Sequence, residues 1–200
     1  MCGQFVFIPQ DELNRIILDV KRNLAAEKTA NVSAEYQSVF PKADVPVIVQ
    51  SNNRLETEVL KWGYPVSWEK GPVFNTRFET ALGKPGNMWR ASLEKRRCVV
   101  PSFGFFEPHK TETTVSPKTG KPIKQKYFFR LPNCNAVMMA GVYEAGHFSI
   151  MTTAPNRWME PIHPRMPVIL LPDEIDGWLN GAYTSFTDRS NIELVSEAVA

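Results

Sequence analysis

The second residue of this chain is a cysteine, and that position gives one residue two nucleophiles. The sequence begins Met1-Cys2-Gly3, and methionine aminopeptidase removes an initiator methionine that precedes a residue as small as cysteine. The α-amine of the new first residue would titrate at about 7.7–8.0, so part of it is neutral near physiological pH. This amine can condense with an aldehyde, and the thiol can then add to the imine and close a five-membered thiazolidine. The alternative is that cysteine stands at this position without a chemical role.

A glutamate and a histidine later in the chain have surroundings that suit proton transfer. Glu107 ends the apolar run PSFGFFE, and in a strand it would share a face with the aromatic residue two positions earlier. A carboxyl group in apolar surroundings has a raised pKa, which favours general acid–base chemistry. His163 lies in the segment PIHPRMP, whose prolines stiffen the loop, and Arg165 follows two residues later. A solvated strand end is the alternative for Glu107, whereas His109 and His147 are expected in turns on the surface.

Three further residues have side chains that suit contacts with a nucleic acid. Asn75 and Arg77 are two positions apart in FNTRFET and share a face of an extended segment. An asparagine can hydrogen-bond a nucleophile or a base edge, and an arginine suits a phosphate; a polar strand face is the alternative. Trp68, in the loop-like VSWEKGP, is a candidate for stacking on an unpaired base, whereas Trp62 and Trp89 are expected in the core.

These side chains must be positioned by a fold that the sequence predicts to be rich in short strands. Apolar runs bounded by turn residues predict about eight strands, namely QFVFIP, PVIVQ, Leu55 to Tyr64, RCVVPSFGFFE, KYFFRL, NAVMMAGVYE, HFSIMTT and PVILLP. Apolar spacing from Leu13 to Leu24, after a capping Asp11, predicts a helix of roughly 14 residues. Two shorter helices are expected near Met88–Leu93 and after Pro172. Residues 31–43 are expected to form a loop.

Strands and helices do not alternate regularly in this pattern, which excludes a doubly wound sheet. We expect an α+β fold on a mainly antiparallel, partly closed, barrel-like β-sheet with a few short helices. The 200 residues, 43% of them hydrophobic, can bury one sizeable core, so residues 1–200 are expected to form a single domain.

The composition limits the partners of the chain. A net charge of +2 does not suit a general nucleic-acid coat, so a nucleic acid would need a local basic groove. Three cysteines argue against a disulfide framework and for a reducing compartment. No metal or cofactor is expected, and no signal peptide or bilayer-spanning run is apparent, which predicts a cytoplasmic protein without a membrane partner. The lysine-rich segment 116–126 is interpreted as a solvated hairpin tip, with a basic flap beside a nucleic-acid groove as the alternative.

The motifs occur together in an order that resembles a known family. Met-Cys-Gly, WGYPVSW, FNTRFET, RRCVVPSFGFFE and TTAPNRWMEPIHPRMPVIL are similar to the motif blocks of the SRAP family, the SOS response-associated peptidases. In two places the chain departs from the family pattern. Pro108 stands where an aromatic residue usually follows the glutamate. In AEYQSVFPKADVP, Tyr36 matches, but Glu35 and Gln37 replace an arginine and an asparagine.

The resemblance implies binding of single-stranded DNA at abasic sites and a covalent thiazolidine link through the N-terminal cysteine. It implies a compact, β-rich α+β fold with a positively charged DNA channel, and autoproteolytic removal of residues ahead of the cysteine. Carried over by position, Cys2 is the nucleophile, Asn75 orients it, Glu107 is the acid–base residue and His163 assists sugar ring opening. Arg77 is the phosphate-binding arginine, and Trp68 and Arg165 are further DNA-binding candidates. A monomer that associates with the nucleoid while on DNA is expected.

Two other functions fit the same residues. Cys2, His163 and Glu107 could form the acyl-transfer site of an N-terminal-nucleophile cysteine peptidase or amidase. The chain could instead be a catalytically silent single-stranded nucleic-acid binder that uses the same groove. Turnover of a peptide or amide without DNA adducts would favour the first, and binding that ignores both abasic sites and Cys2 would favour the second.

Overall fold

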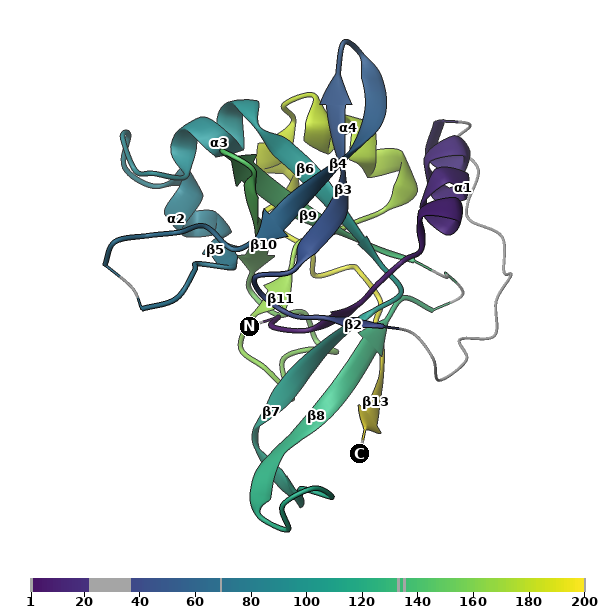
Figure 1. Cartoon of the computed structure of the whole chain (residues 1–200), viewed down its shortest axis with the longest axis vertical. Helices are drawn as coiled ribbons and strands as arrows, with labels where there is room; N and C mark the ends of the chain where they lie inside the picture. The colour runs from purple at the N-terminus through teal and green to yellow at the C-terminus, as the bar shows by residue number, and fades with distance from the viewer. Residues whose placement is uncertain (1, 22–36, 69, 133, 135, 200) are drawn as a thin grey trace.

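The computed structural model describes residues 2–21, 37–68, 70–132, 134 and 136–199, and Figure 1 shows a mixed α/β fold made mostly of strands. The strands are β1 (Phe5–Val6), β2 (Ser38–Val39), β3 (Asp44–Ser51), β4 (Arg54–Trp62), β5 (Asn75–Arg77), β6 (Arg97–Ser102), β7 (Phe105–Val115), β8 (Pro122–Arg130), β9 (Val137–Glu144), β10 (His147–Thr153), β11 (Met166–Pro167), β12 (Ile169–Leu170) and β13 (Val195–Val199). The helices are α1 (Gln10–Lys21), α2 (Phe78–Leu82), α3 (Arg90–Lys95) and α4 (Ile175–Leu179), with short 3-10 helices at Pro172–Glu174 and Tyr183–Phe186.

One sheet closes into a ring. Strand β10 pairs in parallel with β4 and antiparallel with β9, and the antiparallel pairings β4–β3, β3–β6 and β6–β9 complete the circle. Short strands β5 and β11 also pair with β10, and β12 pairs with β9. The predicted partly closed, mainly antiparallel sheet is therefore confirmed.

Both faces of the ring are buried along β3, β6, β9 and β10, which explains why these strands are mostly apolar, whereas β4 is largely exposed and alternates polar and apolar residues. Val47 and Val49 belong to one hydrophobic cluster, whereas Ile48 between them belongs to the other. Successive residues of a strand point to opposite faces, so each cluster packs on its own side of the sheet. Helix α1 covers part of this core with Leu13 and Ile16, which fits the spacing that predicted it; Leu24 lies outside the described residues.

A second, five-stranded sheet has the order β13-β8-β7-β1-β2. Its β7–β8 hairpin extends away from the ring, toward the bottom of Figure 1. The residues between the two strands are exposed except for Ser116, so the lysine-rich segment is a hairpin tip in solvent, as interpreted from the sequence. The pairing of β7 with β8 is regular up to Pro108 and resumes at Thr113 after a bulge.

Several expected elements differ from those observed. The described residues form thirteen strands rather than about eight, because two apolar runs are each divided between two strands and because β2, β5 and β13 lie outside the predicted runs. RCVVPSFGFFE supplies β6 to the ring and β7 to the second sheet, and PVILLP supplies the short β11 and β12. The expected loop 31–43 contains β2, while residues 31–36 lie outside the described part. His109 and His147 lie in strands and are only partly exposed, not in surface turns.

The change of sheet between β6 and β7 depends on Gly104. A Cβ at this position would lie 2.3 Å from Cζ of Phe128 and 2.5 Å from the backbone oxygen of Phe129, and the backbone cannot move aside easily. We expect Gly104→Ala to lower the free energy of unfolding by about 3 kcal/mol, measured by urea denaturation. Gly120→Ala is no steric control, since φ there is +68°. Gly71→Ala is the matched control, because nothing lies within 4 Å of its Cβ position. Equal stability of the Gly104 and Gly71 variants would contradict this account of the turn.

Candidate functional site around Cys2

The second sheet brings the start of the chain to Glu107. Phe5 of β1 pairs with Phe105 of β7, and the amide of Phe106 donates a 2.9 Å hydrogen bond to the carbonyl of Gln4. In this antiparallel register the residues before β1 run alongside the residues that follow Phe105. Cys2 therefore lies beside Glu107, and both side chains are fully buried.

The ring contributes Asn75, which holds Cys2 in place. The amide nitrogen Nδ2 of Asn75 donates a 2.8 Å hydrogen bond to the backbone oxygen of Cys2. The other end of the amide, Oδ1, is buried and has no hydrogen-bond partner among the described residues. Strand β5 owes its position to parallel pairing with β10, in which Asn75 lies opposite Ile150. An acceptor is thus available near the backbone of Cys2.

Burial sets the protonation of Cys2 and Glu107. Desolvation raises the pKa of Glu107 to about 7, although the positive charge of the chain's amino terminus opposes the shift. Desolvation, followed by the negative charge of Glu107, also raises the pKa of the Cys2 thiol. The thiol is consequently protonated at neutral pH, while Glu107 can both give and take a proton.

His163 faces Glu107 from the loop between β10 and β11. Its Nε2 lies 3.9 Å from Oε2 of Glu107, beyond direct hydrogen-bond distance but within reach of a small movement or a bound group. On the other side of the His163 imidazole, Nδ1 lies 2.9 Å from the carbonyl oxygen of Arg165. Burial lowers the pKa of His163, so the imidazole is neutral at pH 7, and with a proton on Nδ1 its Nε2 is a base.

The two arginines that the sequence selected differ in their surroundings. Arg77 is exposed at the end of β5. Arg165 is largely enclosed, with its guanidinium in a bidentate ion pair with Glu79 at 2.7 and 3.0 Å and a 2.7 Å bond to the carbonyl of Thr152. The geometry therefore suits Arg77 for a phosphate and gives Arg165 the role of fixing the His163 loop to β10.

The tryptophans also fall into two groups. Trp62 and Trp89 are buried, as predicted, with Trp62 packed 4.8 Å from Phe5 and donating a hydrogen bond to Phe74. Trp68 is 66% exposed in the loop between β4 and β5, which extends from the left side of the molecule in Figure 1. An exposed indole of this size can stack on a ligand.

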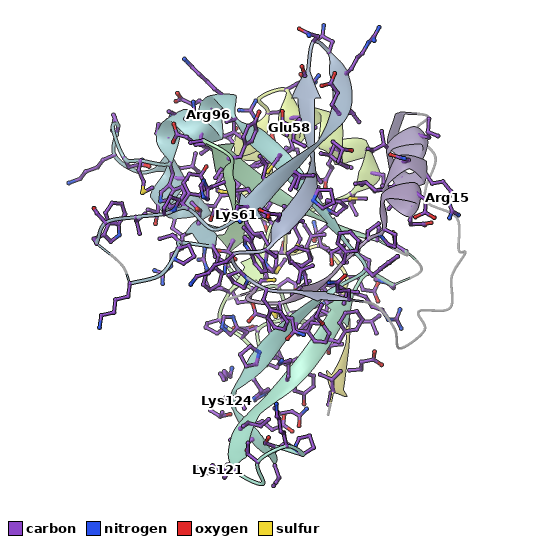
Figure 2. All side chains as sticks on the ribbon, in the orientation of Figure 1. Arg15, Glu58, Lys61, Arg96, Lys121 and Lys124 are labelled. Carbon is purple, nitrogen blue, oxygen red and sulfur yellow. The ribbon has the colours of Figure 1, made fainter. Side chains whose placement is uncertain are left out.

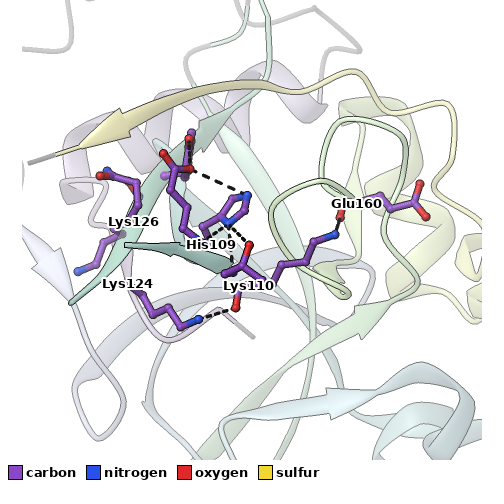
Figure 3. Close-up of polar contacts among 9 residues, drawn as sticks. His109, Lys110, Lys124, Lys126 and Glu160 are labelled. Atoms are coloured by element: carbon purple, nitrogen blue, oxygen red, sulfur yellow. Dashed lines mark hydrogen bonds and ion pairs between the residues drawn. The ribbon is translucent and has the colours of Figure 1, made fainter. Parts of the chain in front are cut away.

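Sequence reasoning missed the residues of the β7 bulge that hold the His163 loop, shown in Figure 3. The backbone amide of Lys110 donates to Ile162 at 2.8 Å, and its Nζ donates to the carbonyl of Glu160 at 3.0 Å. Nδ1 of His109 accepts the amide of Glu112 at 2.8 Å and so closes the bulge. Glu107 and the loop of His163 are thereby fixed to the same strand. A bulge has no distinct sequence pattern. The available signal was the run of three polar residues, His109 to Thr111, after the apolar part of the strand.

Two kinds of feature are absent from the described part of the chain. It contains no group of three or more His, Cys, Asp or Glu side chains that could hold a metal ion. None of its helices is both long and apolar enough to cross a membrane.

The fold places this chain among compact, β-rich α+β proteins of known structure. A crystal structure of a protein from Bacteroides thetaiotaomicron superposes with a TM-score of 0.69 at 22% identity, covering 100% of this chain and 92% of that one. A protein from Bordetella bronchiseptica gives a TM-score of 0.69 at 20% identity over the full length of both chains. These similarities establish the fold.

The family follows from the sequence. The family model described as SOS response associated peptidase (SRAP) matches residues 1–198, and this chain belongs to that family. Abasic site processing protein YoqW from Bacillus subtilis is 35% identical over 159 residues, which cover 72% of this chain and 66% of YoqW. Abasic site processing protein YedK from Escherichia coli is 26% identical over 190 residues, covering 90% of this chain and 79% of YedK. The match to YoqW thus spans slightly less than two thirds of that relative.

Proposed function

We propose that this protein binds single-stranded DNA at abasic sites and becomes covalently linked to it through a thiazolidine formed by Cys2. The observation that carries the proposal is the burial of Cys2 between the Asn75 amide and a carboxyl group, Glu107, whose pKa is raised to about 7. The printed names of the relatives, abasic site processing proteins, support the DNA lesion as the source of the aldehyde. Removal of Met1 is part of the proposal, because only a terminal Cys2 has a free amine.

The reaction begins at the amine. The thiol of Cys2 is protonated, so the neutral α-amine, oriented by the free Oδ1 of Asn75, attacks C1′ of the ring-opened sugar. Neutral His163 exchanges a proton with O4′ during ring opening. Protonated Glu107 gives its proton to the carbinolamine hydroxyl, which leaves as water and yields the protonated imine.

Thiol addition completes the link. Sγ of Cys2 forms a bond to the carbon of the protonated imine, the electron pair of the C=N double bond passes to the nitrogen, which keeps its proton, and the S–H proton passes to the carboxylate of Glu107. The product is a neutral five-membered ring with no net consumption of acid. Because the same carboxyl group releases and recovers one proton, a pKa near 7 suits both steps.

The wider assignment follows from the family. We propose that residues 1–200 act as one SRAP-type domain and as a monomer in the cytoplasm, associated with the nucleoid while on DNA. Exposed Arg77 holds a phosphate, whereas Arg165 acts on DNA only indirectly, since Glu79 and Thr152 occupy its guanidinium. The family description as a peptidase favours a second activity, removal of residues ahead of Cys2, in which the same residues act on a peptide bond.

A denaturing gel tests the proposal. The purified protein, whose intact mass must first show the loss of Met1, is incubated with a single-stranded oligonucleotide that carries one abasic site. We expect a DNA–protein adduct that survives heating in detergent and is not formed on the same oligonucleotide without the lesion. Adducts that are absent, or that form equally on undamaged DNA, would overturn the proposal and favour the peptidase or the silent binder.

Trp68 provides a further prediction for binding. Stacking of one base on an aromatic side chain contributes about 1–3 kcal/mol, so Trp68→Ala should weaken binding of undamaged single-stranded DNA roughly 5- to 150-fold. Fluorescence anisotropy measures this change. Val59→Ala is the matched control, because Val59 is 68% exposed and Trp68 66%. Wild-type affinity in the Trp68 variant would exclude it as a stacking platform.

A further inference from the structure

A pocket lies beside the Trp68 loop, on the side of the ring where β4 ends and β10 begins. It has a volume of about 310 Å³ and is bordered by Lys42, Lys61, Lys70 and His147. Pro65 and Pro72 supply apolar walls. This volume is at the lower end of the roughly 300–1,000 Å³ of ligand pockets, so a single phosphate with its sugar would fill much of it.

The charge of this pocket is strongly positive. Three lysine side chains meet at it, and Lys61 forms a 2.8 Å ion pair with Asp44. In the described ranges of the chain, neither Lys42 nor Lys70 has an ion-pair partner. Nδ1 of His147 lies 2.9 Å from the carbonyl oxygen of Ala145, which leaves Nε2 as its second polar atom. Two exposed ammonium groups are thus available for an anion.

The backbone holds one of these lysines in an unusual conformation. Lys42 has a φ of 80°, a left-handed region that residues with a long side chain rarely adopt. Its amide donates a 2.8 Å hydrogen bond to the carbonyl of Trp62, and the amide of Trp62 donates a 2.9 Å bond to Ala43. The turn that carries Lys42 is therefore fixed to β4, next to Lys61.

The position of the pocket relates it to the site around Cys2. Strand β10 runs from His147, which pairs with Lys61, to Ile150, which pairs with Asn75. Three residues of a strand span roughly 10 Å, so Lys61 at the pocket and Asn75, which holds Cys2, pair with positions of β10 that are only about this far apart. The exposed Trp68 lies in the loop that joins β4 to β5 and also carries Lys70.

We propose that this pocket, called here the lysine pocket and defined by Lys42, Lys61, Lys70 and His147, binds a backbone phosphate of single-stranded DNA next to the nucleotide that stacks on Trp68. The inference rests on the proposed function for its ligand, because it continues the DNA path from Cys2 past Trp68. It adds a phosphate subsite on the ring, separate from Arg77.

The salt dependence of binding tests this assignment. Each phosphate neutralised on single-stranded DNA contributes about 0.7 to the slope of log K against log salt. The double variant Lys42→Ala/Lys70→Ala, which loses this one phosphate contact, should therefore bind an undamaged oligonucleotide with a slope shallower by about 0.7, and about 5-fold more weakly at 0.1 M salt if the affinities converge at 1 M. Anisotropy titrations at several salt concentrations give both values.

The matched control removes the same charge elsewhere. Lys118→Ala/Lys121→Ala lies at the tip of the β7–β8 hairpin, and Figure 2 places Lys121 far from Lys61. Its slope should remain that of the wild type. An unchanged slope in the Lys42/Lys70 variant, or equal losses in both variants, would overturn the inference. A midpoint of thermal unfolding equal to that of the wild type verifies that the fold of each variant is intact.

Failure of this inference is distinguishable from failure of the proposed function. A wild-type protein that forms no adduct with abasic DNA refutes the crosslinking proposal, whatever its salt slope. A wild type that forms the adduct, together with a Lys42/Lys70 variant of unchanged slope and affinity, refutes the lysine pocket alone.

Discussion

Cys2→Ala is expected to abolish the heat-stable adduct with abasic DNA completely. Alanine is also small enough for Met1 to be removed, so the variant keeps a terminal amine but loses the thiol. It should still form an imine, which borohydride reduces to a stable amine and which hydrolyses without that treatment. The measurement is a denaturing gel of wild type and variant, each with and without borohydride. The wild type should give the stable band in both cases, and the variant only after reduction.

The control for this experiment is another free thiol. Cys134 is partly exposed and unpaired by any disulfide, and Cys134→Ala should crosslink as the wild type does. Because Cys98 is a buried core residue, its replacement would test packing instead. A heat-stable adduct in Cys2→Ala without borohydride would assign the chemistry to a different nucleophile. Absence of the adduct from Cys134→Ala would likewise contradict the assignment of the chemistry to Cys2.

Glu107→Gln is expected to slow adduct formation by about 10²- to 10³-fold, since general acid–base catalysis typically contributes factors of this size. The neutral amide keeps the shape of the side chain but can neither release nor recover a proton. In the wild type the rate should fall above about pH 7 as Glu107 loses its proton, and the variant should lack that fall. Single-turnover rates between pH 5 and pH 9 provide both observations.

Glu112→Gln is the matched control for Glu107. It removes a carboxylate from the same strand, but this one is exposed and accepts a hydrogen bond from Tyr127, which an amide oxygen can also accept. Its rate and pH profile should match the wild type. A Glu107 variant that retains the wild-type rate, or one that keeps the decline above pH 7, would remove Glu107 from the proposed mechanism.

The same carboxyl group makes stability depend on pH. The pKa of Glu107 is raised from 4.5 to about 7, so between these values the unfolded chain releases a proton that the folded chain retains. Folding stability therefore falls as pH rises through this window, by about 3 kcal/mol in total. Glu107→Gln should be more stable than the wild type at pH 8 and equal to it at pH 4. This higher stability of the variant at pH 8 is expected where a buried carboxyl group serves the reaction at a cost in folding stability.

The elements were predicted best where the pattern of residues is local. PVIVQ and HFSIMTT lie in β3 and β10, and the amphipathic spacing after Leu13 lies in α1. The predictions were wrong where one apolar run serves two strands. RCVVPSFGFFE reads as one strand, but Gly104 allows a close approach to Phe128 at which the chain passes to the other sheet. Pairing with strands that are distant along the chain decides where the run divides, and a run of apolar residues carries no information about that pairing.

The candidate residues divide in the same way. Cys2, Asn75, Glu107 and His163 were selected from their types and from the family motifs, and the structure brings these four together. Arg165 was selected for DNA, yet Glu79 and Thr152 hold it, because β5, which leads into α2, and β11, which follows Arg165, both pair with β10. Neither the Lys110 contacts nor the lysine pocket could be predicted, since their partners are distant along the chain.

Cys2 shows most clearly what the sequence determines and what only the tertiary structure determines. The sequence alone predicted that this residue can carry both an amine and a thiol, because that prediction depends only on removal of the preceding Met1. Tertiary structure decided what surrounds those groups: the pairing of β1 with β7 supplies Glu107, and the pairing of β5 with β10 supplies Asn75. Burial then raises the pKa of both Glu107 and the Cys2 thiol. Desolvation is a property of the packed chain, and no local pattern of residues contains it.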